Sequence, residues 1–166
     1  MCTFTYFPLK NNFILTSNRD EHINRGVSKF PVVKQFGYET ITFPQDPEAG
    51  GTWLATSDKK RTIVLLNGAF EKHKHLPPYR VSRGIVLLDA FKFKSLTEFS
   101  EIYSLVNVEP FTIIQVNGHQ KTIEELRWDG DKTFITPYCF KKPHIWSSAT
   151  LYTPKVISQR QNWFNE

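Results

Sequence analysis

The chain has 166 residues, of which 40% are hydrophobic and 22% charged, the usage of one globular domain spanning residues 1–166. Its apolar runs are far shorter than the roughly twenty residues of a spanning helix, which excludes an integral membrane protein. The formal net charge of +5 comes from residues 1–83, with 12 basic and 7 acidic side chains. Such a basic half suits an anionic ligand, a phosphate or a membrane surface, and the plainer interpretation is a solvated lysine-rich face.

Two short strands open the chain. Residues 2–7 alternate Thr with aromatic side chains, and residues 13–17 form a second strand after a turn cluster at 8–12. If this five-residue loop closes a hairpin, Phe7 pairs with Phe13 and Cys2 lies opposite Asn18, whereas a bulge would shift the register by one. The end of the second strand then lies beside the start of the chain.

The rest of the sequence predicts groups of strands that alternate with helices. We expect strands at 31–35, 38–43, 52–56 and 61–66, helices at 85–93 and 95–106, and strands at 111–116, 120–128 and 132–136. Thr153 and Pro154 provide an N-cap and a first-turn proline for a last helix. Strands, then helices, strands and a helix predict an α+β layered domain of antiparallel sheets rather than a βαβ fold.

The two cysteines, Cys2 and Cys139, form neither a disulfide framework nor a metal-binding pair. The N-terminus lacks a basic segment followed by an apolar core, so we expect a cytoplasmic protein. Nucleic-acid motifs are lacking as well, so no nucleic-acid partner is expected. We expect Cys139 to be a small buried side chain, and Trp53 and Trp128 to fill the core.

Cys2 is the most informative residue for chemistry. Removal of Met1 would leave its thiol beside a free α-amine, and an α-amine titrates near pH 8 and can take the thiol proton. The alternative is that a small residue follows Met1 by chance. The hairpin register brings Arg19 and Asp20 close to this thiol; Arg19 could favour a thiolate or bind a substrate carboxylate, and Asp20 could orient the amine. A solvated ion pair at a strand end would look the same.

Asn67 follows a buried strand and precedes Gly68, which suits either a donor to an oxyanion or an ordinary turn. In the basic loop that follows, Arg80 and Arg83 could bind an anionic group; a mobile surface loop is the plainer interpretation. His73 and His75 lie in the same loop, but the spacing offers no third ligand, so we expect no metal site.

Several motifs together resemble the NRDE family, whose eukaryotic member is transport and Golgi organisation protein 2. The resemblance covers residues 1 to about 155. It rests on the Met1-Cys2 start and on the segments Asn18-Arg19-Asp20-Glu21, Gly51-Thr52-Trp53-Leu54, Leu65-Leu66-Asn67, Ser82-Arg83-Gly84 and Trp146-Ser147-Ser148-Ala149 through Thr153-Pro154-Lys155.

That resemblance implies an N-terminal-nucleophile (Ntn) hydrolase fold, a four-layer αββα sandwich. It also implies a cysteine hydrolase of linear amide bonds, with Cys2 as nucleophile, Asp20 as the carboxylate beside it and Asn67 as oxyanion donor. Arg19 belongs with these catalytic candidates, and Asn18, Arg80 and Arg83 with the ligand-binding ones. Ser148 stands where the family motif has Asn, and the order Asn18-Arg19-Asp20 departs from that of the related acylases.

The resemblance leaves a second function class open. The eukaryotic family member is linked to haem and lipid handling, so the alternative is a non-catalytic binding or transfer protein, with haem as ligand rather than resident cofactor. The chain ends at Asn165-Glu166, just inside the last expected helix, which favours a fragment or a trimmed chain.

Overall fold

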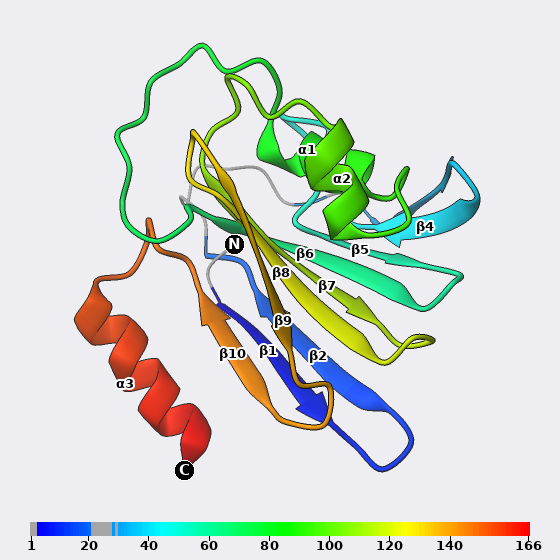
Figure 1. Cartoon of the computed structure of the whole chain (residues 1–166), viewed down its shortest axis with the longest axis vertical. Helices are drawn as coiled ribbons and strands as arrows, with labels where there is room; N and C mark the ends of the chain where they lie inside the picture. The colour runs from blue at the N-terminus through cyan, green and yellow to red at the C-terminus, as the bar shows by residue number, and fades with distance from the viewer. Residues whose placement is uncertain (1–2, 21–27, 29) are drawn as a thin grey trace.

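The computed structural model describes residues 3–20, 28 and 30–166, which form two antiparallel sheets and three helices (Figure 1). The small sheet has the strand order β10-β1-β2, and the large sheet runs β3-β4-β5-β6-β7-β8-β9. The strands are β1 Thr3–Pro8, β2 Phe13–Asn18, β3 Val32–Phe36, β4 Glu39–Phe43, β5 Leu54–Ser57, β6 Arg61–Asn67, β7 Phe111–Asn117, β8 Thr122–Trp128, β9 Thr133–Tyr138 and β10 His144–Ser147. The helices are α1 Arg83–Ala90, α2 Leu96–Ile102 and α3 Pro154–Asn165.

The elements stack in four layers, as expected for an αββα sandwich. Along β6, Ile63 and Leu65 face the cluster under α1 and α2, whereas Val64 and Leu66 face the cluster between the two sheets. All four are buried, because successive side chains of a strand point to opposite faces and both faces of this sheet are covered. The small sheet has α3 on its outer side, where Phe7 meets Phe164 at 5.1 Å between ring centroids.

The register of the first hairpin differs by one residue from the sequence prediction. Thr3, not Cys2, lies opposite Asn18, and Phe7 pairs with Ile14. The predicted pairing was wrong because Pro8 belongs to the strand: the Leu9 N–H donates to the Asn12 carbonyl at 2.8 Å and closes a shorter turn. A one-residue shift exchanges the two faces of a strand, and the observed register puts Ile14 rather than Leu15 on the solvent side.

The last helix begins where its predicted cap stands, whereas α1 begins at Arg83 rather than 85 and α2 at Leu96 rather than 95. The Thr153 hydroxyl accepts the Val156 N–H with Pro154 in the first turn, which confirms the predicted start of α3, and the Ser82 hydroxyl accepts the Ile85 N–H at the start of α1. Both middle helices end earlier than predicted, at Ala90 and Ile102. Among the described residues, every helix is too short or too polar to traverse a bilayer.

Two expectations about single side chains were wrong, and one strand was missed. Cys139 is exposed, because β9 ends at Tyr138 and leaves the thiol in a turn. Trp128 is buried in the core as expected, but Trp53 is only half-buried and lies against Arg19. Strand β10 went unpredicted since its four residues are too few to show an alternating pattern.

Candidate functional site

Four strands end or begin at one edge of the sandwich. Thr3 starts β1 and pairs with Asn18, the last residue of β2, and with Ser147, the last residue of β10. The end of β6 joins them, since the Ser148 hydroxyl donates to the Asn67 carbonyl at 2.8 Å. Cys2 lies outside the described residues. The covalent neighbour of Cys2 and the predicted residues Arg19, Asp20 and Asn67 therefore share this edge.

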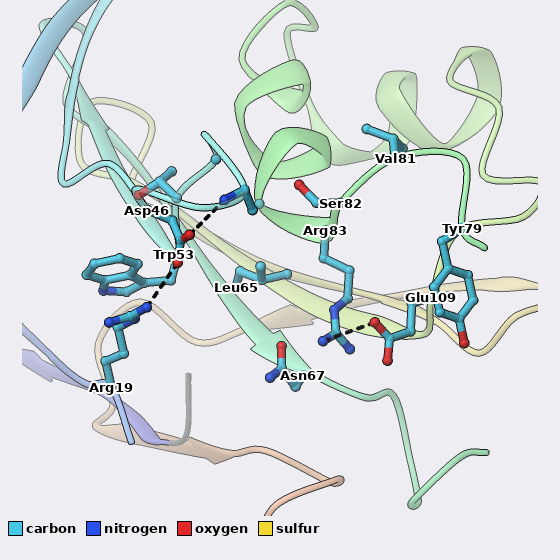
Figure 2. A pocket seen from close by; sticks show the side chains of 14 residues that line it. Arg19, Asp46, Trp53, Leu65, Asn67, Tyr79, Val81, Ser82, Arg83 and Glu109 are labelled. Carbon is cyan, nitrogen blue, oxygen red and sulfur yellow. Dashed lines mark hydrogen bonds and ion pairs between the residues drawn. The ribbon is translucent and has the colours of Figure 1, made fainter. Parts of the chain in front are cut away.

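A cavity of about 340 Å³ opens here between the end of β6 and the start of α1 (Figure 2). Its volume lies within the range of small-molecule sites. Its wall combines apolar surface with two arginines, two carboxylates and an amide: Arg19, Asp46, Ala49, Gly51, Thr52, Trp53, Leu65, Asn67, Tyr79, Val81, Ser82, Arg83, Gly84 and Glu109. Three predicted site residues, Arg19, Asn67 and Arg83, are thus brought to one cavity.

Asn67 carries the only amide side chain among the described residues of the cavity wall, and in Figure 2 it lies between the two arginines. Its main-chain carbonyl accepts from Ser148 at 2.8 Å and from Thr150 at 3.3 Å. The next residue, Gly68, adopts a φ of +81°, so the chain leaves β6 in a turn that a side chain would strain. Asn67 is therefore anchored through its backbone, and its side-chain amide has no hydrogen-bond partner within residues 3–20, 28 and 30–166.

Arg19 forms one charged wall of the cavity. Its guanidinium pairs with Asp46 at 3.0 Å and lies 4.3 Å from the centroid of the Trp53 ring. Asp46 also accepts main-chain N–H bonds from Glu48 and Ala49 at 3.0 and 2.9 Å. Because the Asp46 side chain is only 8% exposed, the charge of Arg19 offsets part of the cost of burying this carboxylate. Arg19 is consequently held in one orientation, which suits a fixed cationic wall.

Arg83 forms the opposite charged wall through Glu109. The guanidinium lies 3.2 Å from one Glu109 oxygen, and the His73 and His75 rings lie 3.0 and 3.1 Å from the other. Partial burial alone would raise the pKa of Glu109, but Arg83 and the two imidazole hydrogen bonds outweigh it and lower that pKa below its ordinary value. Glu109 thus stays ionised. Its contacts with the two histidines attach their loop, residues 68–82, to the cavity wall.

A close backbone approach sets the position of Arg83. A Cβ on Gly84 would come within 2.8 Å of the Thr52 backbone, and one on Gly51 within 2.6 Å of Gly84. The Thr52 N–H donates to the Gly84 carbonyl at 3.3 Å across this contact. The two glycines let the start of α1 lie directly on the segment before β5, which brings Arg83 and Trp53 to the same cavity.

Asp20 lies beside the cavity rather than in its wall. The Tyr152 hydroxyl donates to the Asp20 carboxylate, and the Tyr152 ring lies 4.0 Å from the Arg160 guanidinium. Arg160 in turn donates to the hydroxyl of Thr3. Helix α3 and the segment before it therefore support both the predicted carboxylate and the residue that follows Cys2.

Two predicted ligand-binding residues lie elsewhere. Asn18 is exposed at the end of β2 and is not part of the cavity wall. The Arg80 guanidinium donates to the main-chain carbonyls of Ser104 and Val106, 3.4 Å away for the latter, and lies over the Tyr103 ring. Arg80 therefore fastens the 68–82 loop to the segment after α2.

Three side chains that hold the candidate site were not predicted from the sequence: Asp46, Glu109 and Tyr152. Asp46 sits between Gln45 and Pro47 in a turn, and Glu109 directly precedes Pro110 and a buried strand, so an acidic residue at a turn was the available signal. Their arginine partners lie 27 and 26 residues away, a separation that no local pattern spans. Within the described part of the chain, no three metal-ligating side chains are arranged to hold an ion.

The comparisons with solved structures define the class of fold. A variant of conjugated bile acid hydrolase from Clostridium perfringens matches with a TM-score of 0.57 and 11% identity, over 98% of this chain and 57% of that one. Penicillin V acylase from Agrobacterium tumefaciens matches with a TM-score of 0.60 and 8% identity, over 99% of this chain and 57% of that one. The chain therefore has an Ntn-hydrolase-like α+β fold and spans a little over half the length of these neighbours.

The family follows from the sequence itself. Residues 1–165 match Transport and Golgi organisation 2, and the chain belongs to this family, as the NRDE resemblance predicted. A search of curated proteins gave no match.

Proposed function

We propose that this protein is an N-terminal-nucleophile cysteine hydrolase that cleaves a linear amide bond of a small molecule. The observation that carries the proposal is the edge shared by Thr3, Asp20 and Asn67. Chain connectivity alone keeps Cys2 within one residue of Thr3, which pairs with the ends of β2 and β10. A nucleophile there would have a carboxylate on one side and an amide donor on the other.

The proposed reaction has two halves. After removal of Met1, the Cys2 α-amine takes the thiol proton, and the sulfur attacks the amide carbonyl to give a tetrahedral oxyanion. The side-chain amide of Asn67 donates to that oxyanion. The C–N bond then breaks, the ammonium returns its proton to the leaving amine, and a thioester remains on Cys2. Water adds to the thioester, releases the carboxylic acid and restores the thiol.

The remaining residues position the groups that react. Asp20, held by the Tyr152 hydroxyl, would orient the Cys2 ammonium. Arg19, fixed between Asp46 and Trp53, would favour the thiolate form of Cys2 by its charge. Arg83 would attract an anionic group of the substrate. These roles give each charged wall of the cavity a task in a single reaction.

The cavity indicates the class of substrate. Trp53, Leu65 and Val81 offer apolar contact, and the guanidinium groups of Arg19 and Arg83, each paired with a carboxylate of the same wall, offer donors that an anionic group of the substrate would share. A volume of about 340 Å³ suits a molecule of modest size. The names of the structural neighbours denote a conjugated bile acid hydrolase and a penicillin V acylase. We therefore propose a partly apolar, anionic amide as the substrate.

Intact-mass measurement with iodoacetamide tests the nucleophile. We expect loss of Met1 and labelling of Cys2 that is faster than labelling of Cys139, which is exposed and serves as the internal reference. A screen of N-acyl amino acids should then show hydrolysis that Cys2→Ala abolishes and Cys139→Ala leaves unchanged. Retained Met1, or equal labelling of both thiols, would contradict the proposal. A Soret shift on hemin titration without any hydrolysis would favour the haem-binding alternative.

A further inference from the structure

A second cavity lies at the opposite end of the sandwich from the candidate site. It has a volume of about 850 Å³ and is bordered by the turns that join β1 to β2, β5 to β6, β7 to β8 and β9 to β10. These turns lie at the lower right of Figure 1. Lys60 and Thr62 line the cavity at the start of β6, whereas Asn67 of the candidate site ends that strand. The two cavities are thus separated by the length of β6.

Each of these four turns contributes one lysine to the cavity: Lys10, Lys60, Lys121 and Lys141. All four side chains are exposed, and none forms an ion pair with a carboxylate of the described residues. The described residues that line the cavity include no acidic side chain. The rim therefore carries uncompensated positive charge from four separate segments of the chain.

Two of these lysines occupy backbone conformations that favour glycine. Lys60 and Lys121 have φ angles of 59° and 57°, in the left-handed region. In that region the backbone of a lysine is strained relative to that of glycine or asparagine. Each lysine side chain also adds to the electrostatic repulsion among the four cations of the rim. An anion at the rim would relieve that repulsion, which gives these unfavourable lysines a functional reason.

Apolar side chains accompany the lysines. Leu9 lies at the tip of the β1–β2 turn, next to Lys10, and is 54% exposed. Inside the cavity the Phe13 and Phe140 rings meet edge to face, with their centroids 5.7 Å apart. Exposed apolar side chains beside clustered lysines are typical of proteins that bind the surface of an anionic membrane.

We propose that this end of the molecule docks on an anionic phospholipid surface. The four lysines would bind lipid phosphates, and Leu9 would enter the interfacial layer of the bilayer. A soluble anion would engage the lysines but leave Leu9 in water, so the exposed leucine at the tip favours the membrane. The proposal does not depend on the hydrolase proposal, because no residue is shared between the two cavities.

Vesicle co-sedimentation tests the docking. We expect the protein to bind phosphatidylcholine vesicles that contain about 20 mol% phosphatidylserine at about 0.1 M salt, and to bind vesicles of phosphatidylcholine alone at least about tenfold less. The double variant Lys10→Glu/Lys141→Glu should lose at least about tenfold of the binding to the anionic vesicles. Leu9→Ser should weaken binding at high salt, where the electrostatic contribution is screened.

A matched variant controls for net charge. Lys72 and Lys74 are equally exposed but lie in the 68–82 loop, so Lys72→Glu/Lys74→Glu makes the same change in charge away from the lysine rim and should retain binding. Thermal unfolding of all variants confirms that they fold. Equal losses in the two double variants would overturn the proposal. Rim-dependent binding of inorganic pyrophosphate with no binding to vesicles would also overturn it.

Discussion

The hydroxyl of Ser148 donates a hydrogen bond of 2.8 Å to the main-chain carbonyl of Asn67, across 81 positions of sequence. Ser148 is fully buried and directly follows β10 of the small sheet, whereas Asn67 ends β6 of the large sheet. The bond therefore joins the two sheets at the edge of the candidate site. In this structure the role of Ser148 is to hold the backbone of Asn67.

Replacing Ser148 by alanine tests this role. Ser148→Ala removes the donor, and we expect a loss of about 1 kcal/mol in the free energy of unfolding, measured by urea denaturation. If Asn67 acts as an oxyanion donor, kcat for amide hydrolysis should fall as well. Ser147→Ala is the matched control, because Ser147 is the preceding residue and only half-buried. Equal stability of the two variants would contradict the assigned role.

Asn67→Ala tests the oxyanion donor itself. Loss of one such donor typically lowers kcat by about 10²–10³-fold, and we expect a decrease of this size with little change in KM. The structure gives the Asn67 side chain no hydrogen bond among the described residues, so the stability of the variant should stay close to that of the parent protein. Asn162→Ala, on an exposed face of α3, serves as the control. A kcat within twofold of the parent would rule out this role for Asn67.

The order of elements could be predicted because each local pattern agrees with the fold. The expected strands at 61–66, 111–116 and 120–128 and the expected cap at Thr153 lie within a few residues of β6, β7, β8 and the start of α3. The hairpin register could not be predicted, because the local sequence does not show that Pro8 continues β1 and that the turn closes from Leu9 to Asn12. Local patterns thus predict which strands and helices form, whereas the pairing register of a hairpin also depends on how its turn closes.

The candidate site could be predicted only in part, because some of its residues are held by partners that are distant in sequence. Asn67 and Arg83 could be found because each stands next to a recognisable strand or helix boundary. Asp46, Glu109 and Tyr152 act through partners distant in sequence, and their positions emerge only once the layers stack. Arg80 was a candidate from the same basic loop as Arg83, but the Gly51–Gly84 contact brings only Arg83 to the cavity.

Arg61 links the large sheet to the helical layer. Its side chain is 2% exposed, donates to the Phe91 carbonyl at 2.9 Å and pairs with Glu39 at 3.2 Å. Burial lowers the pKa of Arg61, and Glu39 partly offsets this effect. We expect Arg61→Met to lower the free energy of unfolding by about 3–5 kcal/mol, because it leaves the Glu39 charge and the Phe91 carbonyl without their donor.

The double variant Arg61→Met/Glu39→Gln separates these two contributions. Removing the charge of Glu39 as well should restore part of the stability, since a neutral amide is cheaper to leave unpaired. Chemical denaturation of both single variants and the double variant gives the coupling free energy between the two residues. Additive losses would show that the ion pair contributes nothing beyond the two separate side chains.

Glu109 makes the stability of the candidate site depend on pH. Its pKa lies below the ordinary value of 4.5, so its ionised form is favoured in the folded state. The resulting stabilisation is fully present above pH 4.5 and is lost as the pH falls through the folded-state pKa. Glu109→Gln should therefore lower the free energy of unfolding by about 1–3 kcal/mol near neutral pH, where the Arg83 and His73 contacts depend on the charge. The difference in the free energy of unfolding between Glu109→Gln and the parent protein should disappear as the pH is lowered.

Urea denaturation of both proteins from about pH 7 to pH 3 measures this gap. Glu48→Gln, which removes an exposed carboxylate near the same cavity, should show no comparable gap at any pH. If the difference in the free energy of unfolding between Glu109→Gln and the parent protein stays the same down to acid pH, the shape of the Glu109 side chain, and not its charge, contributes to stability.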